Sequence, residues 1–153
     1  MIQVREPTAA DDAAIATVIA SGIATLRQTY RPTPAAVARK ADLVLHRLVA
    51  IDGDAIVGTV EYACNGERLH LMGLYTLDSH RGRGVARRVI DALVVIANAH
   101  GARTLSLYTI RETGNVPIFE RLGFAVIREE AARDIASDRH PYLTEAYLER
   151  WLG

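Results

Sequence analysis

Residues 77–88, with the sequence LDSHRGRGVARR, connect a strand-like segment to a helix-like segment. An apolar run from Leu69 to Leu77 enters this stretch, and the run from Val85 to Ala99 that leaves it repeats apolar residues on one helical face. The first N–H groups of a helix lack intrahelical partners and carry partial positive charge. Glycines allow an anion to approach those groups, and side-chain charge is added there by Arg81, Arg83, Arg87 and Arg88. The stretch therefore predicts a phosphate-binding turn.

The spacing within this turn excludes two common classes of phosphate site. A dinucleotide-binding turn would need a glycine where Arg87 stands, and a P-loop needs a lysine, whereas the only lysine is Lys40. The spacing R-x-x-G-x-A, formed by Arg81, Gly84 and Ala86, instead resembles the acyl-CoA pyrophosphate loop of the GNAT superfamily of N-acyltransferases. The superfamily pattern is Q/R-x-x-G-x-G/A.

A second block supports the resemblance. Residues 115–124, NVPIFERLGF, are similar to the late segment N-x-x-x-Y-E-x-L-G-F of the superfamily, and the two blocks occur in the expected order. The resemblance covers about residues 43 to 130. It implies an α/β (α+β) fold with a mixed, mostly antiparallel central sheet of six to seven strands flanked by about four helices, with residues 1–153 as one domain.

Two helices are expected near the N-terminus. Thr8, with Asp11 three residues later, predicts the start of a helix that runs to about Ser21 or beyond, with Gly22 as a point of interruption. Two prolines then break the chain before a second short helix at about residues 35–40. The resemblance implies that residues 30–34 border the acceptor site.

The remaining segments are predicted as strands joined by tight turns. Asp52-Gly53-Asp54 and Asn65-Gly66 are hairpin signals. Gly101 ends the helix of residues 85–99. The tail from Pro141 to Leu152 fits a strand or a short helix, and we favour the strand. The other predicted strands are Ile2–Arg5, Leu43–Ile51, Ala55–Ala63, Arg68–Leu77, Arg103–Ile110 and Val126–Arg128.

The resemblance also implies where acetyl-CoA, the cosubstrate, is held. In the superfamily the pantetheine arm lies like an extra strand between the two strands that match residues 68–77 and 103–110. The backbone of Leu74, Tyr75 and Thr76 would pair with the pantetheine amides, and a backbone N–H there could polarise the thioester carbonyl. Contacts with the cosubstrate would further come from Arg81, Gly82, Arg83, Gly84, Val85, Ala86, Arg87, Asn115 and Phe119. Asn115 fits a helix cap equally well.

Candidates for the general base lie near the middle of the chain. His70 alternates with Leu69 and Leu71, so its side chain points away from theirs, and the ordinary pKa of imidazole, about 6.5, suits removal of a proton through water. A half-exposed strand histidine is the alternative. Glu61, Glu112 and water are rival bases; either carboxylate could instead bind a cationic acceptor or be a plain surface group.

The general acid is left open because Phe119 stands where the superfamily commonly has a tyrosine, often credited with protonating the CoA thiolate. Tyr108 is the first substitute, followed by Tyr75 and Tyr142. An aromatic packing residue is the alternative reading of Tyr108.

Composition limits the remaining classes of function. The 153 residues include 18 basic and 18 acidic side chains, so no overall field favours nucleic acid or an anionic membrane. Cys64 is the only cysteine, which excludes an internal disulfide and fits a small buried side chain. No apolar stretch approaches the roughly 20 residues of a membrane span, and we expect a cytoplasmic protein. A metal site is not expected, because no ligand spacing relates Cys64 to His46, His80, His100 or His140.

The sequence thus predicts an N-acetyltransferase that moves an acetyl group from acetyl-CoA to a primary amine by direct attack in a ternary complex. The acceptor is a small molecule or a peptide: a small amine, an amino acid derivative, an antibiotic or a protein N-terminus. A homodimer is left open. The alternative is a non-catalytic acyl-CoA sensor of the same fold.

Overall fold

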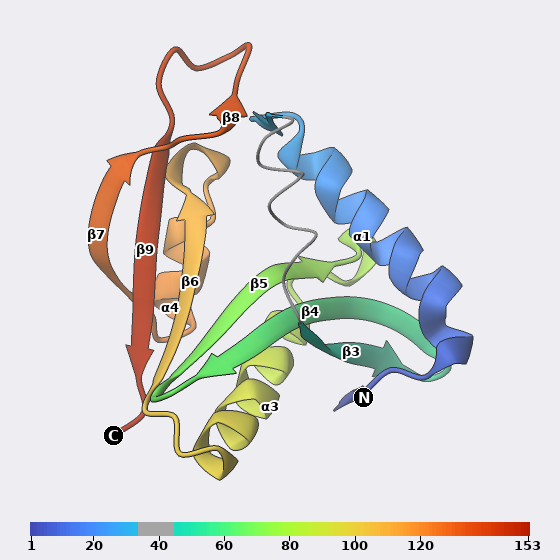
Figure 1. The fold of residues 1–153 in the computed structure, drawn as a ribbon. Helices are drawn as coiled ribbons and strands as arrows, with labels where there is room; N and C mark the ends of the chain where they lie inside the picture. Colours follow the sequence, from blue (N-terminus) through green and yellow to red (C-terminus); the bar gives the residue numbers. More distant parts are fainter. Residues whose placement is uncertain (34–44) are drawn as a thin grey trace.

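The computed structural model describes residues 1–33 and 45–153. Its main sheet has seven strands in the order β1-β3-β4-β5-β6-β9-β7, and β2 pairs separately with β8 (Figure 1). Neighbouring strands are antiparallel except β5 and β6, which are parallel. The strands are β1 (Ile2–Arg5), β2 (Arg31–Pro32), β3 (His46–Asp52), β4 (Ala55–Asn65), β5 (Arg68–Thr76), β6 (Thr104–Ile110), β7 (Ala125–Ala131), β8 (Ile135–Ala136) and β9 (Thr144–Trp151). The predicted mixed, mostly antiparallel sheet is confirmed.

The described residues contain three α-helices, α1 (Asp12–Leu26), α3 (Val85–Ala99) and α4 (Val116–Arg121). Three short 3-10 turns precede α1, α3 and α4: η1 (Ala9–Asp11), η2 (Asp78–His80) and η3 (Arg111–Thr113). The helix predicted at residues 35–40 and the first two residues of the strand predicted from Leu43 lie outside the described residues.

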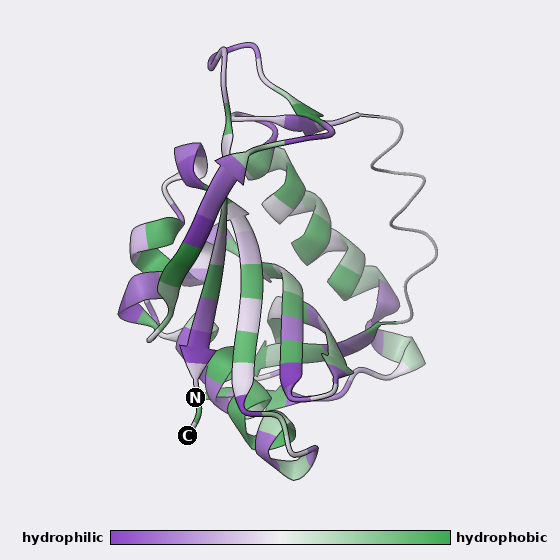
Figure 2. Cartoon of the chain, turned by 60° about the vertical axis from the view of Figure 1, so that its left-hand side comes forward, coloured by the Kyte–Doolittle hydropathy of each residue, from purple (hydrophilic) through white to green (hydrophobic). Residues whose placement is uncertain are grey.

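The helices cover the two faces of the sheet differently. Alternating side chains divide each strand between the faces, which gives the banded colouring of the sheet in Figure 2. Leu69 and Leu71 of β5 join α3 in the main core, whereas Ile15 and Val18 of α1 pack on the opposite face of β3 and β4. Consequently α1 and α3 lie on opposite sides of the sheet (Figure 1).

Helix α1 continues through Gly22, so the predicted interruption there is wrong. Gly22 is buried, and a Cβ atom at this position would lie 2.1 Å from Cδ1 of Tyr75. The glycine is therefore required by close packing of α1 on β5.

The helical stretch Ala9–Leu26 is, by length and composition, long and apolar enough to cross a membrane, contrary to our expectation. The core helix of a soluble protein passes the same test, so this finding alone is weak evidence for a membrane span.

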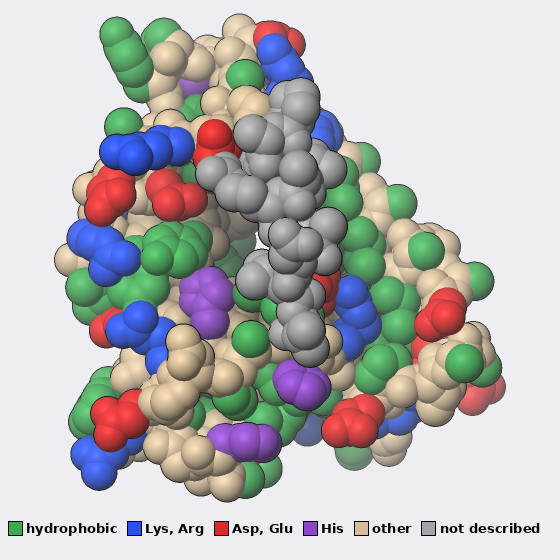
Figure 3. Space-filling model, in the orientation of Figure 1, with side chains coloured by type: hydrophobic (Ala, Val, Ile, Leu, Met, Phe, Trp, Pro, Cys, Tyr) green, Lys and Arg blue, Asp and Glu red, His purple; other side chains and the backbone are tan. Residues whose placement is uncertain are grey.

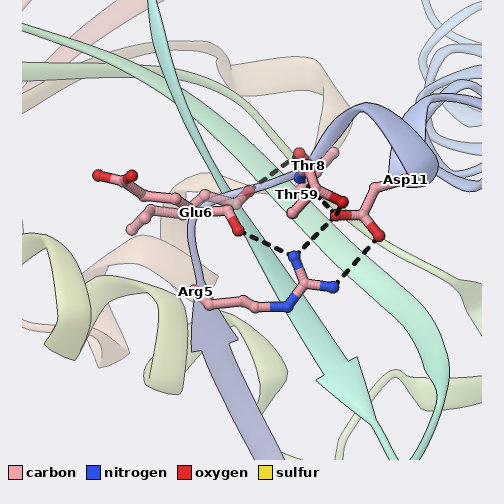
Figure 4. Close-up of polar contacts among 6 residues, drawn as sticks. Arg5, Glu6, Thr8, Asp11 and Thr59 are labelled. Atoms are coloured by element: carbon pink, nitrogen blue, oxygen red, sulfur yellow. Dashed lines mark hydrogen bonds and ion pairs between the residues drawn. The ribbon is translucent and has the colours of Figure 1, made fainter.

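An ion pair fixes the start of α1 relative to β1 (Figure 4). Arg5 donates to both carboxylate oxygens of Asp11, at 2.7 and 3.2 Å, and to the carbonyl of Glu6 at 2.8 Å. Asp11 Oδ2 also accepts a hydrogen bond from the Thr8 backbone N–H at 2.7 Å. The predicted helix start at Thr8 is confirmed, with one 3-10 turn before the α-helix.

The tail of the sequence forms a strand, as favoured, and its position was not predicted. β9 inserts between β6 and β7, and its residues Glu145 to Trp151 pair with the whole length of β6. The small β2–β8 sheet was also missed; it ties the end of α1 to the segment before β9. Over β7 and β9, basic and acidic side chains alternate on the surface (Figure 3).

Candidate active site: a cleft between two diverging strands

The site begins where β5 and β6 separate. These parallel strands pair at three positions only, the last being His70 with Ser106. Beyond His70, β5 contains a bulge in which Gly73 and Leu74 together face Val60 of β4. Gly73 has φ of +59°, a left-handed conformation that favours glycine, and such bulges bend a strand. The bend coincides with the separation of β5 from β6.

The space between the strands is a cleft of about 1010 Å³. Leu77 N–H donates to Val57 O of β4 at 2.8 Å, so strand alternation directs the backbone groups of Leu74 and Thr76 toward the cleft. Twelve of the fourteen predicted site residues line this cleft: Leu74, Tyr75, Thr76, Arg81, Gly82, Gly84, Val85, Ala86, Arg87, Tyr108, Asn115 and Phe119. His70 and Arg83 do not line it.

The predicted phosphate-binding turn forms one end of the cleft, at the first turn of α3. Gly84 is the N-cap residue of α3, with φ of +81°, and a Cβ atom there would meet nothing within 4 Å. No acidic residue lies in this first helical turn, although Arg87 does. Arg87 also donates to Arg121 O at 3.2 Å, which joins α3 to α4. Cations at the positive end of a helix dipole are unfavourable unless an anion accompanies them, so this end is suited to pyrophosphate.

Asn115 and Phe119 line the same cleft from α4. Asn115 is the N-cap residue, but its side chain makes no capping hydrogen bond; its backbone N–H donates to Thr113 Oγ1 at 3.3 Å. The alternative reading of Asn115 as a side-chain cap is therefore wrong, and the amide is free of that role. Phe119 packs edge-on against Phe124, with ring centroids 5.9 Å apart, and offers no proton.

His70 lies at the vertex of the cleft, on the face away from Leu69 and Leu71, as predicted. Its Nδ1 is 2.8 Å from Oγ of Ser106, which is fully buried, and its ring lies edge-on to Tyr108 with centroids 5.3 Å apart. Burial, and secondly the charge of Arg68, lower the pKa of His70 below its ordinary value. The imidazole is thus held neutral and in a fixed orientation.

Tyr108 extends from this vertex into the cleft. Its side chain is 48% exposed, and its Oη accepts a hydrogen bond from Arg128 at 3.3 Å. The ring also packs on that of Tyr147, with centroids 5.0 Å apart.

The two rival carboxylates are held by other groups. Glu61 forms an ion pair with Arg47 at 3.1 Å, between β4 and β3. Glu112 Oε1 accepts the Thr144 backbone N–H at 2.6 Å. Neither side chain lines the cleft.

Tyr30, which belongs to the segment predicted to border the acceptor site, lines the cleft just after α1. Two further residues of the lining were not predicted: Glu145, at the start of β9, and His80 in η2. Burial is the main cause that raises the pKa values of Tyr30, Tyr75 and Glu145. His80 Nε2 lies 2.9 Å from Asp52 Oδ2, and this hydrogen bond lowers the pKa of Asp52. No local signal marks Glu145, because it reaches the cleft only through the insertion of β9 beside β6.

Cys64 and the histidines form no metal centre among the described residues. Cys64 is half-buried against the main core, and burial raises the pKa of its thiol. Within residues 1–33 and 45–153, no three His, Cys, Asp or Glu side chains gather in a way that could hold a metal ion.

Comparisons with known proteins agree with this geometry. Among curated protein sequences, no significant match is found. Solved structures superpose over the whole chain, and at these identities the likeness establishes the fold. A GCN5-related N-acetyltransferase from Kribbella flavida is 22% identical with a TM-score of 0.72, covering 99% of this chain and 98% of that one. A nourseothricin acetyltransferase is 21% identical with a TM-score of 0.73, covering 99% of each chain. The structure of yncA from Salmonella typhimurium, described with acetyl-CoA as its cofactor, is 16% identical with a TM-score of 0.74, covering 100% and 95%.

The sequence profile of the acetyltransferase (GNAT) family matches residues 22–124, which span α1 from Gly22 through the turn after α4. This range contains the bulged strand β5, the glycine-arginine turn and the segment that begins at Asn115. The chain therefore belongs to the GNAT acetyltransferase family.

Proposed function

We propose that this protein transfers an acetyl group from acetyl-CoA to a primary amine by direct attack of the amine. The observation that carries the proposal is the separation of β5 from β6 in line with the glycine-arginine turn at the start of α3. One opening thus combines two unpaired strand edges with an anion-binding helix end. Acetyl-CoA, when bound, would supply the activated acetyl thioester.

The residues of the chain fit the parts of this cosubstrate. The backbone N–H groups around Gly84 and the side chains of Arg81 and Arg87 would bind the pyrophosphate. The backbone of Leu74 to Thr76 would pair with the amides of the pantetheine arm, as an added strand would. One N–H of this edge would donate to the thioester carbonyl and stabilise the charge that develops on its oxygen.

Proton transfer is assigned to the pair of aromatic residues at the vertex. His70 Nε2 has no hydrogen-bond partner among the described residues, so it would accept the amine proton, through a water molecule because His70 does not line the cleft. Tyr108 lines the cleft and would protonate the departing thiolate in place of the absent tyrosine at position 119.

The direct test is release of CoA thiol in the presence of a panel of primary amines, with the acetylated product identified by mass spectrometry. We expect turnover that depends on both acetyl-CoA and amine. Turnover without an amine would indicate hydrolysis and would contradict transfer.

Phe119 favours a second candidate, the non-catalytic acyl-CoA sensor, because a sensor has no use for an acid at this position. The same panel separates the two. A protein that binds acetyl-CoA by calorimetry and releases no thiol with any amine would support the sensor.

A further inference from the structure

The charged side chains that line the cleft are segregated by sign. Three arginines, Arg81, Arg87 and Arg121, lie at its end next to α3 and α4. The only acidic side chain in the described lining is Glu145. Glu145 pairs in register with Ile110 and shares the strand face of Tyr147, which is the face opposite α3. The cleft is therefore positive where pyrophosphate would bind and negative on its other face.

The side chain of Glu145 makes no hydrogen bond or ion pair with any described residue, although it is partly buried. Its nearest strand neighbour on β7 is another carboxylate, Glu130. Burial raises the pKa of Glu145, the repulsion of Glu130 adds to this, and Arg128 opposes it. A desolvated carboxylate without a partner is unfavourable, and a docked cation would remove that cost.

Aromatic side chains line the same cleft as this carboxylate. Tyr30, at the end of α1, is close enough to Glu145 for its charge to raise the pKa of the phenol, and Tyr75 acts on Tyr30 in the same way. Tyr30, Tyr75 and Tyr108 all line the cleft. Aromatic faces attract organic cations, so these rings favour the same sign of ligand as Glu145, whereas the charge of Arg27 acts on Tyr30 and Tyr75 in the opposite direction.

A cation that binds Glu145 would not be the nitrogen that is acetylated. An amine must be neutral to attack the thioester, whereas a carboxylate in contact would stabilise its protonated form. The group held at Glu145 must therefore be a second cation, separate from the amine that is acetylated.

We propose that Glu145 binds a non-reacting, positively charged group of the acceptor, so that the substrate class is an amine with a second cationic centre. This inference rests on the proposed acetyl transfer and names the acceptor for that site. It predicts that a diamine is preferred to a monoamine of equal length, and that an amine with a distal carboxylate is rejected.

The test compares cadaverine, n-pentylamine and 5-aminopentanoate as acceptors, by initial rates of CoA release. We expect the kcat/KM for cadaverine to exceed that for n-pentylamine by about tenfold or more, the usual size of one charge-assisted contact. Glu145→Gln should remove this difference through KM for cadaverine and leave n-pentylamine within about twofold. Glu145→Lys should make 5-aminopentanoate the best of the three.

Two matched variants each remove one carboxylate elsewhere. Glu130 neighbours Glu145 on β7 without lining the cleft, and Glu67 lies exposed in the turn between β4 and β5. Both Glu130→Gln and Glu67→Gln should keep the preference for cadaverine. If Glu130→Gln loses the preference for cadaverine as fully as Glu145→Gln does, the effect comes from a diffuse acidic field and the assignment is overturned. The assignment is also overturned if Glu145→Gln reduces the activities with cadaverine and n-pentylamine equally.

Failure of the proposed acetyl transfer has a different signature. In that case no amine releases CoA, and calorimetry of cadaverine with the CoA-loaded protein still decides the role of Glu145. Binding that is lost in Glu145→Gln and kept in Glu67→Gln supports the cation site. Binding that Glu145→Gln leaves unchanged, or no binding at all, overturns it.

Discussion

His70 stands at the point where β5 and β6 part, and its properties at that point depend on two neighbours. Ser106 fixes the ring by a hydrogen bond of 2.8 Å, and burial with Arg68 lowers the pKa. A histidine with a lowered pKa stays neutral at physiological pH and becomes protonated only below its ordinary value of about 6.5. The proposed base is thus available over the whole neutral range and is lost only as the pH falls through that lowered value.

The first prediction follows from the lowered pKa of His70. The acid limb of the kcat/KM profile should contain an inflection below about pH 6.5. His70→Ala should lower kcat/KM at neutral pH and lose less at high pH, where the amine deprotonates unaided. His100→Ala, on the exposed end of α3, is the matched control and should keep the parent profile. If His70→Ala runs parallel to the parent at every pH, His70 is not the base.

The second prediction concerns Tyr108, whose ring lies edge-on to His70 and whose side chain lines the cleft. Tyr108→Phe should reduce kcat about a hundredfold, the usual contribution of a general acid, with little change in CoA affinity. Phe119→Tyr in that background should restore part of the rate. Tyr142→Phe is the control, since Tyr142 is 87% exposed and does not line the cleft. Full turnover of Tyr108→Phe would assign the acid to water or another group.

At the level of elements, the turn before α3 and the turn between β4 and β5 provide a natural comparison. Gly84 and Gly66 have φ values of +81° and +63°, and a Cβ atom at either position meets nothing within 4 Å. An alanine costs roughly 1–2 kcal/mol in this conformation at both sites. Only Gly84, however, lies where pyrophosphate would approach.

The third prediction is that Gly84→Ala and Gly66→Ala lower the free energy of unfolding by similar amounts, while only Gly84→Ala weakens CoA binding. Gly84→Glu should abolish binding, because it adds a like charge to the strain, and Gly66→Glu should not. Calorimetry with CoA measures the binding, and urea unfolding measures the free energy of unfolding. Unchanged CoA affinity in Gly84→Glu would remove this turn from the binding site.

The fourth prediction concerns the junction of β1 with α1. The Arg5 hydrogen bond, followed by the Thr8 backbone N–H, lowers the pKa of Asp11 far below its ordinary value. A carboxylate with a lowered folded-state pKa stabilises the fold above its unfolded value near 4, and this contribution is lost as the pH falls toward the folded value. Asp11→Asn should therefore lower Tm at pH 7, with the difference shrinking below about pH 4. Asp12→Asn, one residue later, removes a first-turn charge without this ion pair and should change Tm less; equal effects would refute the role of the pair.

At the scale of the whole molecule, the side of the cleft proposed for the acceptor is bounded by the packing of α1 on β5. Gly22 allows the Tyr75 ring to lie directly on the helix backbone. The fifth prediction is that Gly22→Ala costs about 1–3 kcal/mol through overpacking, or turns the Tyr75 ring into the cleft. Tyr75→Leu in the same chain should recover much of the loss, as measured by urea unfolding. An additive double variant would show that the two residues do not meet.

Local sequence signals predicted the parts of the fold that local chemistry decides. Asp52-Gly53-Asp54 and Asn65-Gly66 form the two hairpins as expected, and α3 covers Val85–Ala99 as its periodicity indicated. The prediction of a helix break at Gly22 was wrong because this glycine is required by a tertiary contact with Tyr75. The placement of β9, the β2–β8 pair and the exposure of Glu145 to the cleft depend on contacts between distant segments, for which adjacent residues carry no signal.

The insertion of β9 between β6 and β7 has a consequence for biosynthesis. β6 is translated before α4 and β7, yet its outer edge finds its partner only when β9 has left the ribosome. Until then the nascent chain presents an unpaired strand edge beside a helix, a surface open to misplaced pairing. The same late strand brings Glu145 to the cleft, so a nascent or prematurely terminated chain contains the turn before α3 while it still lacks this carboxylate.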